Sequence, residues 1–233
     1  VLMGKAFGPG FPRPEFIDAE KLECIALWVA DKRREEKVCC INTAASNAVR
    51  IAQAAAQMGV SLEQTKFRVH GEPITEAKRA VIEQLGGSIV CRYNGGMSLG
   101  GGYGCANPLY TDEVHASEHT LAIIPNPNPL GGGPTIQRLL FTTLHPSAPR
   151  LFLNVENGDY ATFDRRNCGC ALEKVGFGLH LHHIRSYEKF TSEGMNYFYG
   201  DLFDLFEKVL PAEFGGGPGD YQLVEEEDEQ GQT

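Results

Sequence analysis

The sequence predicts an α/β fold with a mixed, mainly parallel sheet, flanking helices and a β-rich subdomain, followed by the start of a small α+β C-terminal domain. Helical and strand patterns alternate over the first hundred residues, which is typical of a parallel sheet covered by helices. Several strand patterns separated by turns then follow one another. Polar extended sequence and one amphipathic helix end the chain. We therefore expect a core over 1–184 and a C-terminal unit over 185–233.

The alternating part begins with EKLECIALWVADKRREEK, whose apolar residues recur at helical spacing. The apolar run VCCIN predicts a buried strand, in which Cys39 and Cys40 are core residues. The Ala-rich segment NTAASNAVRIAQAAAQMG predicts a helix that is capped by Asn42 or Thr43 and ended by Gly59. A strand (KFRVHGE), a helix (TEAKRAVIEQLGG) and a strand (SIVCRY) complete the progression.

Four further strands are expected at HTLAIIP, IQRLLFTTL, PRLFLNV and DYATFDRR, with PNPNPLGGGP as the longest turn. From Arg185 onward, SYEKFTSEGMNYFY is polar and extended. GDLFDLFEKVLPAEF then predicts one amphipathic helix. These changes of pattern place the expected domain boundary near Arg185.

Composition limits the classes of function. The chain has 233 residues, a net charge of −9 and 42% hydrophobic residues, so it can bury a core but offers no basic field to nucleic acid. It has no leader and no apolar run that would span a bilayer, so we expect a cytoplasmic protein with no membrane partner. Seven cysteines give no complete disulfide set and fit reduced thiols or metal ligands. Because the chain opens with VLMGKAFG rather than Met, we expect a fragment.

Three stretches could bind a ligand. RYNGGMSLGGGYGC has six glycines in fourteen residues but matches neither a phosphate loop nor a dinucleotide loop, so a glycine-rich surface loop is the simpler interpretation. HGEPIT lies where a parallel strand ends, the edge at which such sheets bind ligands, although an ordinary turn is more common there. Asp159 lies in an Asn-Gly-Asp turn, where its carboxylate either binds sugar hydroxyls or is simply solvated.

Cysteine and histidine spacing predicts a metal site. Cys168 and Cys170 lie on one tight turn, and Cys105 and His115 flank a loop upstream, which is how two loops build a structural zinc site. Two buried thiols and a surface histidine are the alternative. A competing histidine cluster on one strand is more simply explained by a solvated strand; its members are His180, His182 and His183.

From about Ala44 to its end, the chain resembles the phenylacetate–CoA ligase-like branch of the adenylate-forming enzymes. The resemblance implies that Tyr93 stacks on adenine, and that Asp159 and Arg185 hold the ribose hydroxyls. It also implies a zinc-like ligand set at the Cys/His positions named above. The full nucleotide-binding set that it implies is Gly71, Glu72, Pro73, Arg92, Tyr93, Asn94, Asp159 and Arg185.

The resemblance implies an ATP-dependent ligase that activates a small carboxylic acid, of the phenylacetate or another aromatic type, and passes the acyl group to coenzyme A. ATP or AMP and Mg²⁺ would be its cofactors. Met97 stands where the family has a magnesium-binding Glu, and a thioether is a poor ligand for that cation. Neither Lys189 nor Lys208 lies where the family's catalytic lysine does, and its phosphate loop would precede Val1.

We therefore expect this chain alone to be impaired. The alternative is a non-catalytic relative, namely a nucleotide-binding or zinc-containing interaction module of the same fold. The catalytic residues, the identity of the acid and the oligomeric state, a dimer included, stay open from sequence.

Overall fold

A computed structural model describes residues 17–95, 100–129, 135–187, 189–192 and 195–224. Its main feature is one nine-stranded mixed sheet in the order β1-β2-β3-β4-β5-β9-β8-β7-β6. Only the β1–β2 and β2–β3 pairs are parallel, and the other six neighbouring pairs are antiparallel. The α/β class is confirmed, but the prediction of a mainly parallel sheet is wrong. The predicted β-rich segments continue the same sheet through antiparallel pairing.

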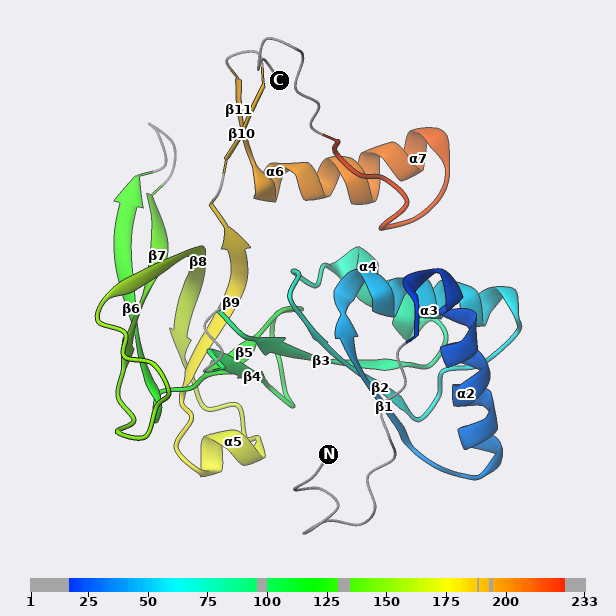
Figure 1. The fold of residues 1–233 in the computed structure, drawn as a ribbon, viewed down its shortest axis with the longest axis horizontal. Helices are drawn as coiled ribbons and strands as arrows, with labels where there is room; N and C mark the ends of the chain where they lie inside the picture. The colour runs from blue at the N-terminus through cyan, green and yellow to red at the C-terminus, as the bar shows by residue number, and fades with distance from the viewer. Residues whose placement is uncertain (1–16, 96–99, 130–134, 188, 193–194, 225–233) are drawn as a thin grey trace.

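The parallel part of the sheet carries the helices (Figure 1). Both crossovers step across the sheet in the same direction, so right-handed connections place their two helices on one face. There α3 packs between α2 and α4. The elements of this part are the 3₁₀ turn η1 (Ala19–Lys21), α2 (Glu23–Arg34), β1 (Cys39–Ala44), α3 (Ala45–Gln57), β2 (Thr65–His70), α4 (Glu76–Glu83) and β3 (Ser88–Tyr93).

The start of α3 differs from the prediction. Asn42 and Thr43 lie within β1, and the N-cap is Ala44, whose side chain accepts no hydrogen bond. The carboxylate of Glu72 does this instead: it accepts from the Ser46 N–H at 2.9 Å and from the Ser46 hydroxyl at 2.7 Å. A residue from the next strand connection thus satisfies a free helix N–H that a local cap would otherwise satisfy.

Of the four strands predicted for the antiparallel part, three are present, and two short strands, Gly102–Gly104 and Val114–Ala116, were not predicted. The predicted turn at PNPNPLGGGP is wrong for its first five residues, which are part of a strand. PRLFLNV is not a strand, because residues 150–154 form a loop that is held by the side chain of Thr143, which donates to the Arg150 carbonyl and accepts from Phe152 N–H. The strands are β4 (Gly102–Gly104), β5 (Val114–Ala116), β6 (Leu121–Pro129), β7 (Thr135–Thr143), β8 (Val155–Arg165) and β9 (Leu179–Ser186), with the short helix α5 (Ala171–Lys174) before β9.

The second half of the glycine-rich stretch is a sheet strand, not a surface loop. A Cβ at Gly102 would lie 2.6 Å from Val114 Cγ2, and a Cβ at Gly104 would lie 2.6 Å from the Cys91 carbonyl oxygen. Glycine is needed at these two positions because a Cβ there would lie too close to the neighbouring strands, whereas Tyr103 between them is partly exposed. Residues 96–99 of the stretch, Met97 among them, lie outside the described residues.

Strand β6 forms an end of the sheet and carries a proline at every second position, Pro125, Pro127 and Pro129. Its antiparallel ladder with β7 is unbroken over all nine residue pairs. An unbroken ladder needs every N–H of β6 that faces β7. The three proline nitrogens carry no proton, so they must face away from β7.

The core runs through both parts of the sheet, from Phe67 and Ile82 under the helices to Phe141 and Leu181 in the antiparallel part. Cys39 is buried there as predicted, but Cys40 is exposed, so its assignment to the core is wrong. Within the described part of the chain, no helix is long and apolar enough to cross a membrane.

The C-terminal segment forms a hairpin followed by one helical run, as the extended and amphipathic patterns predict (Figure 1). The helical run packs on α4 through a buried ion pair, in which Lys78 Nζ lies 3.0 Å from Glu207 Oε1. The predicted boundary at Arg185 falls within β9 and stays a prediction. The elements are β10 (Lys189–Ser192), β11 (Met195–Phe198), α6 (Tyr199–Asp204), a π-helical turn (Leu205–Val209) and α7 (Leu210–Phe214).

Candidate functional site

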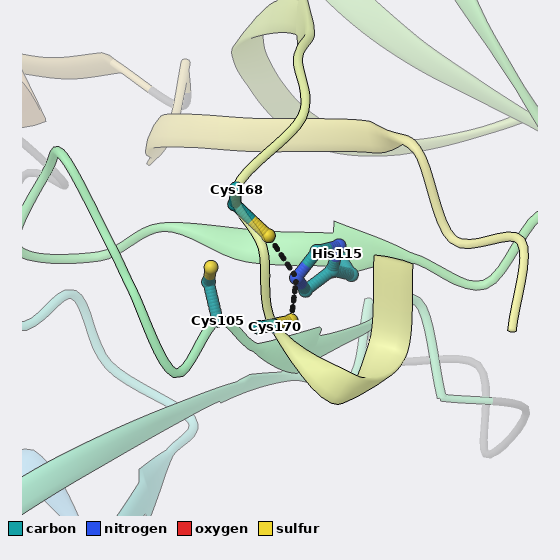
Figure 2. Close-up of side chains that lie close together, drawn as sticks. All are labelled: Cys105, His115, Cys168 and Cys170. Atoms are coloured by element: carbon teal, nitrogen blue, oxygen red, sulfur yellow. Dashed lines mark hydrogen bonds between the residues drawn. The ribbon is translucent and has the colours of Figure 1, made fainter. Parts of the chain in front are cut away.

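The four residues with predicted metal-ligand spacing come together in the structure. One ligand atom from each of Cys105, His115, Cys168 and Cys170 lies within 4.8 Å of all the others. His115 Nε2 is 3.1 Å from Cys170 Sγ and 3.7 Å from Cys168 Sγ, and Figure 2 shows all four side chains gathered. Cys105, His115 and Cys170 are buried and Cys168 is half-buried. Three thiols and one imidazole therefore converge from two separate segments of the chain.

Local structure explains how the two loops reach each other. Cys105 directly follows β4, and its N–H donates to the Glu113 carbonyl at 3.4 Å, which closes the loop that leads into β5 and His115. On the other side, Gly169 has a positive φ of 74°, which lets the chain turn sharply between the two thiols. Cys170 is then the N-cap of α5.

The orientation of His115 suits a metal ligand. Its Nδ1 lies 2.8 Å from the carbonyl oxygen of Phe177, which can only accept a hydrogen bond. Nδ1 therefore carries the proton, and the lone pair of Nε2 faces the thiols. A metal-bound histidine typically has this arrangement, because a hydrogen bond on the far nitrogen fixes its tautomer.

Two of the thiols have pKa values that are shifted in opposite directions. Burial, together with the neighbouring Cys168, raises the pKa of Cys105 to about 12. Burial acts in the same direction on Cys170, but hydrogen bonds from the Glu173 N–H and the Cys168 side chain outweigh it and lower its pKa to about 6. Three thiolates in one buried site would repel one another, and a bound cation would offset this repulsion. The donor set, three sulfurs and one nitrogen, fits a closed tetrahedral zinc site.

The structure adds Glu113 and Arg166 beside the Cys/His cluster, and the sequence indicated neither of them. The Glu113 side chain is fully buried and contacts both the Arg166 guanidinium and His180 Nδ1. Burial alone would raise the pKa of Glu113, but hydrogen bonding from the Leu109 N–H and the charge of Arg166 hold it below its usual value. In the sequence, Glu113 stands out only by lying two residues before His115. Its importance becomes visible only when the fold brings it next to Arg166 and His180.

The predicted solvated strand of histidines is wrong. His180 is fully buried, with its ring 4.1 Å from that of His115, and His182 is buried and stacked on Tyr110 with ring centroids 3.7 Å apart. Only His183 of this cluster is exposed. His180 and His182 are buried because β9 lies inside the sheet between β5 and β8.

Two of the residues assigned to nucleotide binding meet directly. The Tyr93 hydroxyl at the end of β3 donates to Asp159 Oδ2 at 2.7 Å, and the Asn157 amide donates to both residues. Burial and the charge of Asp159 raise the pKa of Tyr93. The Tyr93 ring is half-buried, and Gly101 lies so near to it that an added Cβ would be 2.7 Å from its Cδ1.

The remaining predicted nucleotide residues lie at neighbouring strand ends. Gly71 follows β2 with a positive φ of 82°, and Pro73 continues the connection after Glu72, whose carboxylate binds Ser46 at the start of α3. The Arg92 guanidinium lies 5.9 Å from the centre of the Tyr103 ring. Asn94 directly follows β3 and is half-buried.

Arg185 lies on β9 beside the strand that carries Asp159, since Asp159 is paired with Ser186. Its guanidinium, however, donates to Asp112 Oδ2 at 2.8 Å. The Asp112 carboxylate also accepts from the N–H groups of His183 and Ile184, so it fixes the end of β9. The structure thus brings Tyr93 and Asp159 into contact, and places Arg185 on the adjacent strand with its charge paired to Asp112.

Comparison with known proteins gives a distant structural likeness. No protein-family model matches the sequence, and no curated protein matches it. Among solved structures, the chain is similar to IdnL1, with 14% identity and a TM-score of 0.43 over 84% of this chain and 42% of that one. It is also similar to the amide bond synthetase McbA from Marinactinospora thermotolerans, with 13% identity and a TM-score of 0.42 over 86% of this chain and 40% of that one. The chain spans about two fifths of the length of each.

Proposed function

We propose that this chain is the nucleotide-binding core of an adenylate-forming enzyme of the acid–CoA ligase type. The observation that carries the proposal is the contact of Tyr93 with Asp159, two motif residues that are far apart in the sequence and 2.7 Å apart in the fold. The order of the other motif residues along the chain supports it, from Gly71-Glu72-Pro73 through Tyr93 to Arg185.

In the proposed reaction, the carboxylate of a small acid attacks the α-phosphate of ATP, pyrophosphate leaves, and the thiol of coenzyme A then displaces AMP from the acyl-adenylate. This chain would contribute the adenosine end of the site. Asp159 would accept the ribose hydroxyls in exchange for its present donors, which include Tyr93 and Asn157.

We also propose that Cys105, His115, Cys168 and Cys170 hold one structural zinc ion. Four protein ligands close a tetrahedral shell and leave no position for a water nucleophile, which distinguishes structural from catalytic zinc sites. The zinc, when bound, supplies charge compensation for the thiolates and joins the two loops. The fixed tautomer of His115, set by the Phe177 carbonyl, supports this assignment.

Calorimetric titration of the chain with AMP and ATP tests the nucleotide site. Binding is expected in the wild type and is expected to weaken at least tenfold in Asp159→Ala, because the ribose hydroxyls would lose a charged acceptor. Glu156→Gln is the matched control: it removes a charge from the same strand, where Glu156 pairs with Arg138. Equal nucleotide affinity in the wild type and Asp159→Ala, or no binding at all, would refute the assignment.

A second candidate is a non-catalytic module of the same fold that binds AMP or ATP, or a partner, without turning over an acid. The feature that favours it is Met97, a neutral residue at the position of a magnesium ligand. Acid-dependent pyrophosphate release separates the two candidates. Nucleotide binding without such release would favour the module, and release that depends on an aromatic or another small acid would favour the ligase.

A further inference from the structure

The buried carboxylate of Glu113 connects the two loops that carry the metal ligands. One of its oxygens, Oε2, accepts from the N–H of Leu109 at 2.6 Å and from the N–H of Tyr110 at 3.2 Å. Both donors belong to the loop between Cys105 and His115. Since these N–H groups point inward at a single oxygen, Glu113 determines the path of the loop that leaves Cys105.

The other oxygen reaches the second loop through Arg166, two residues before Cys168. Oε1 accepts from Arg166 Nε at 3.1 Å and from its Nη2. The same Nη2 donates to the Asn107 carbonyl at 2.8 Å, and the Asn107 amide in turn donates to the Cys168 carbonyl at 2.9 Å. A closed ring of hydrogen bonds therefore runs from the first ligand loop to the second and back.

Glu113 could itself be considered a metal ligand, because one of its oxygens lies within 4.8 Å of ligand atoms of Cys105 and His180. The hydrogen bonds argue against this. Both oxygens already accept from N–H donors, so a cation could bind Glu113 only by displacing Arg166 or leaving buried N–H groups unpaired, which is costly. His180 Nδ1 contacts the same carboxylate without hydrogen-bond geometry.

We propose that Glu113 is a positioning residue for the metal centre, which sets the separation between Cys105 and the Cys168–Cys170 turn through Arg166. This inference rests on the metal site proposed above. Residues that orient metal ligands without touching the metal typically change metal affinity by about 10- to 100-fold when they are replaced. An effect of this size is expected for Glu113.

Metal affinity of the full chain tests the proposal. Zn²⁺ is titrated in competition with a chromophoric chelator for the wild type, Glu113→Gln and Glu118→Gln. Glu118 is a matched control, because its carboxylate also binds an arginine, Arg165, and one backbone N–H, that of Leu179, but joins neither ligand loop. We expect Glu113→Gln to weaken Zn²⁺ binding about 10- to 100-fold and Glu118→Gln to leave it within about threefold of the wild type.

Two further measurements separate positioning from a general loss of stability. Co²⁺ replaces Zn²⁺, and its thiolate charge-transfer absorption reports how many sulfurs bind; we expect a weaker band per bound Co²⁺ in Glu113→Gln. Urea unfolding of the metal-free proteins gives the purely structural cost. Arg166→Lys keeps the positive charge but has a shorter side chain with fewer N–H donors. This variant tests the same connection if Glu113→Gln does not fold. It is expected to weaken Zn²⁺ binding in the same direction.

The outcomes are distinguishable. A wild-type chain that binds no Zn²⁺ overturns the proposed metal site itself. A wild-type chain that binds Zn²⁺, with Glu113→Gln and Arg166→Lys binding it equally well and with an unchanged Co²⁺ spectrum, overturns the positioning role alone. Weaker binding in these two variants, with the Glu118→Gln control close to the wild type, supports it.

Discussion

Gly104 offers a direct test of why the sequence is so rich in glycine before Cys105. Its φ lies outside the left-handed region, so backbone conformation does not require glycine there. Space does. A Cβ built on Gly104 would lie 2.6 Å from the Cys91 carbonyl oxygen, 2.7 Å from Val90 Cγ1 and 3.0 Å from the Cys91 nitrogen. Two of these three atoms are backbone, so β3 and β4 would have to separate to admit a methyl group.

The expected effect of Gly104→Ala is a loss of about 1–3 kcal/mol in the free energy of unfolding, the usual range for forcing extra volume into a packed site. Alanine also restricts the unfolded chain, which by itself would stabilise the protein by about 0.4–1 kcal/mol. The steric cost therefore has to exceed this gain. With a urea dependence of about 2 kcal/mol per molar, the unfolding midpoint should fall by about 0.5–1.5 M.

Gly178→Ala is the matched control. Its φ is also outside the left-handed region, and the nearest atom that a Cβ would meet is Arg165 Nη1 at 3.9 Å, an ordinary contact. This substitution should leave the urea midpoint unchanged or raise it slightly. If Gly104→Ala and Gly178→Ala shift the midpoint equally, the close approach of β3 and β4 does not explain the glycine.

Three other predictions follow from burial and charge. Removing the metal with a chelator should make Cys105, Cys168 and Cys170 open to alkylation, in addition to the exposed Cys24 and Cys40. Mass spectrometry maps the labelled thiols, and unchanged labelling would argue against a bound metal. Burial raises the pKa of Cys91 from 9.0 to about 12, so the unfolded thiol ionises first. Between these two pKa values, the free energy of unfolding of the wild type should therefore fall as pH rises, by up to about 1.4 kcal/mol per pH unit relative to Cys91→Ala. Urea unfolding at several pH values measures this, and parallel pH profiles of the two proteins would contradict it. Lys78→Met leaves Glu207 buried without its cation, which should cost about 3–5 kcal/mol and make the C-terminal helices sensitive to limited proteolysis, whereas wild-type resistance would show that the ion pair does not hold them.

The sequence allowed the helices and parallel strands to be predicted because their patterns are local. The Ala-rich helix ends at Gln57, just before Gly59, whose φ of 65° suits the expected helix-ending glycine. Its start could not be predicted, because the group that satisfies Ser46 comes from Glu72, across a strand connection. Strand direction also depends on distant partners. No local pattern in the later strands says that they extend the first sheet in antiparallel pairing, rather than forming a separate subdomain.

The Cys/His cluster was predictable for a different reason. Cysteine and histidine at close spacing are rare enough that Cys168, Cys170 and their partners stand out without a structure. Glu113 and Arg166 are common residue types that acquire a role only when β5 and the loop after β8 lie side by side. The hydrogen bond of Tyr93 with Asp159 is likewise invisible in sequence, although each residue was selected on its own from a motif.

The alternating prolines of β6 determine how this protein can meet copies of itself. Along the outward side of Pro125, Pro127 and Pro129, carbonyl groups can accept hydrogen bonds but the ring nitrogens have no proton to donate. An incoming strand needs both donors and acceptors, so it cannot continue the ladder there. The sheet therefore has an end that resists templated growth, the first step of amyloid-like assembly. Replacing the three prolines with threonine should increase aggregation measured by light scattering, and unchanged solubility would show that something else protects this edge.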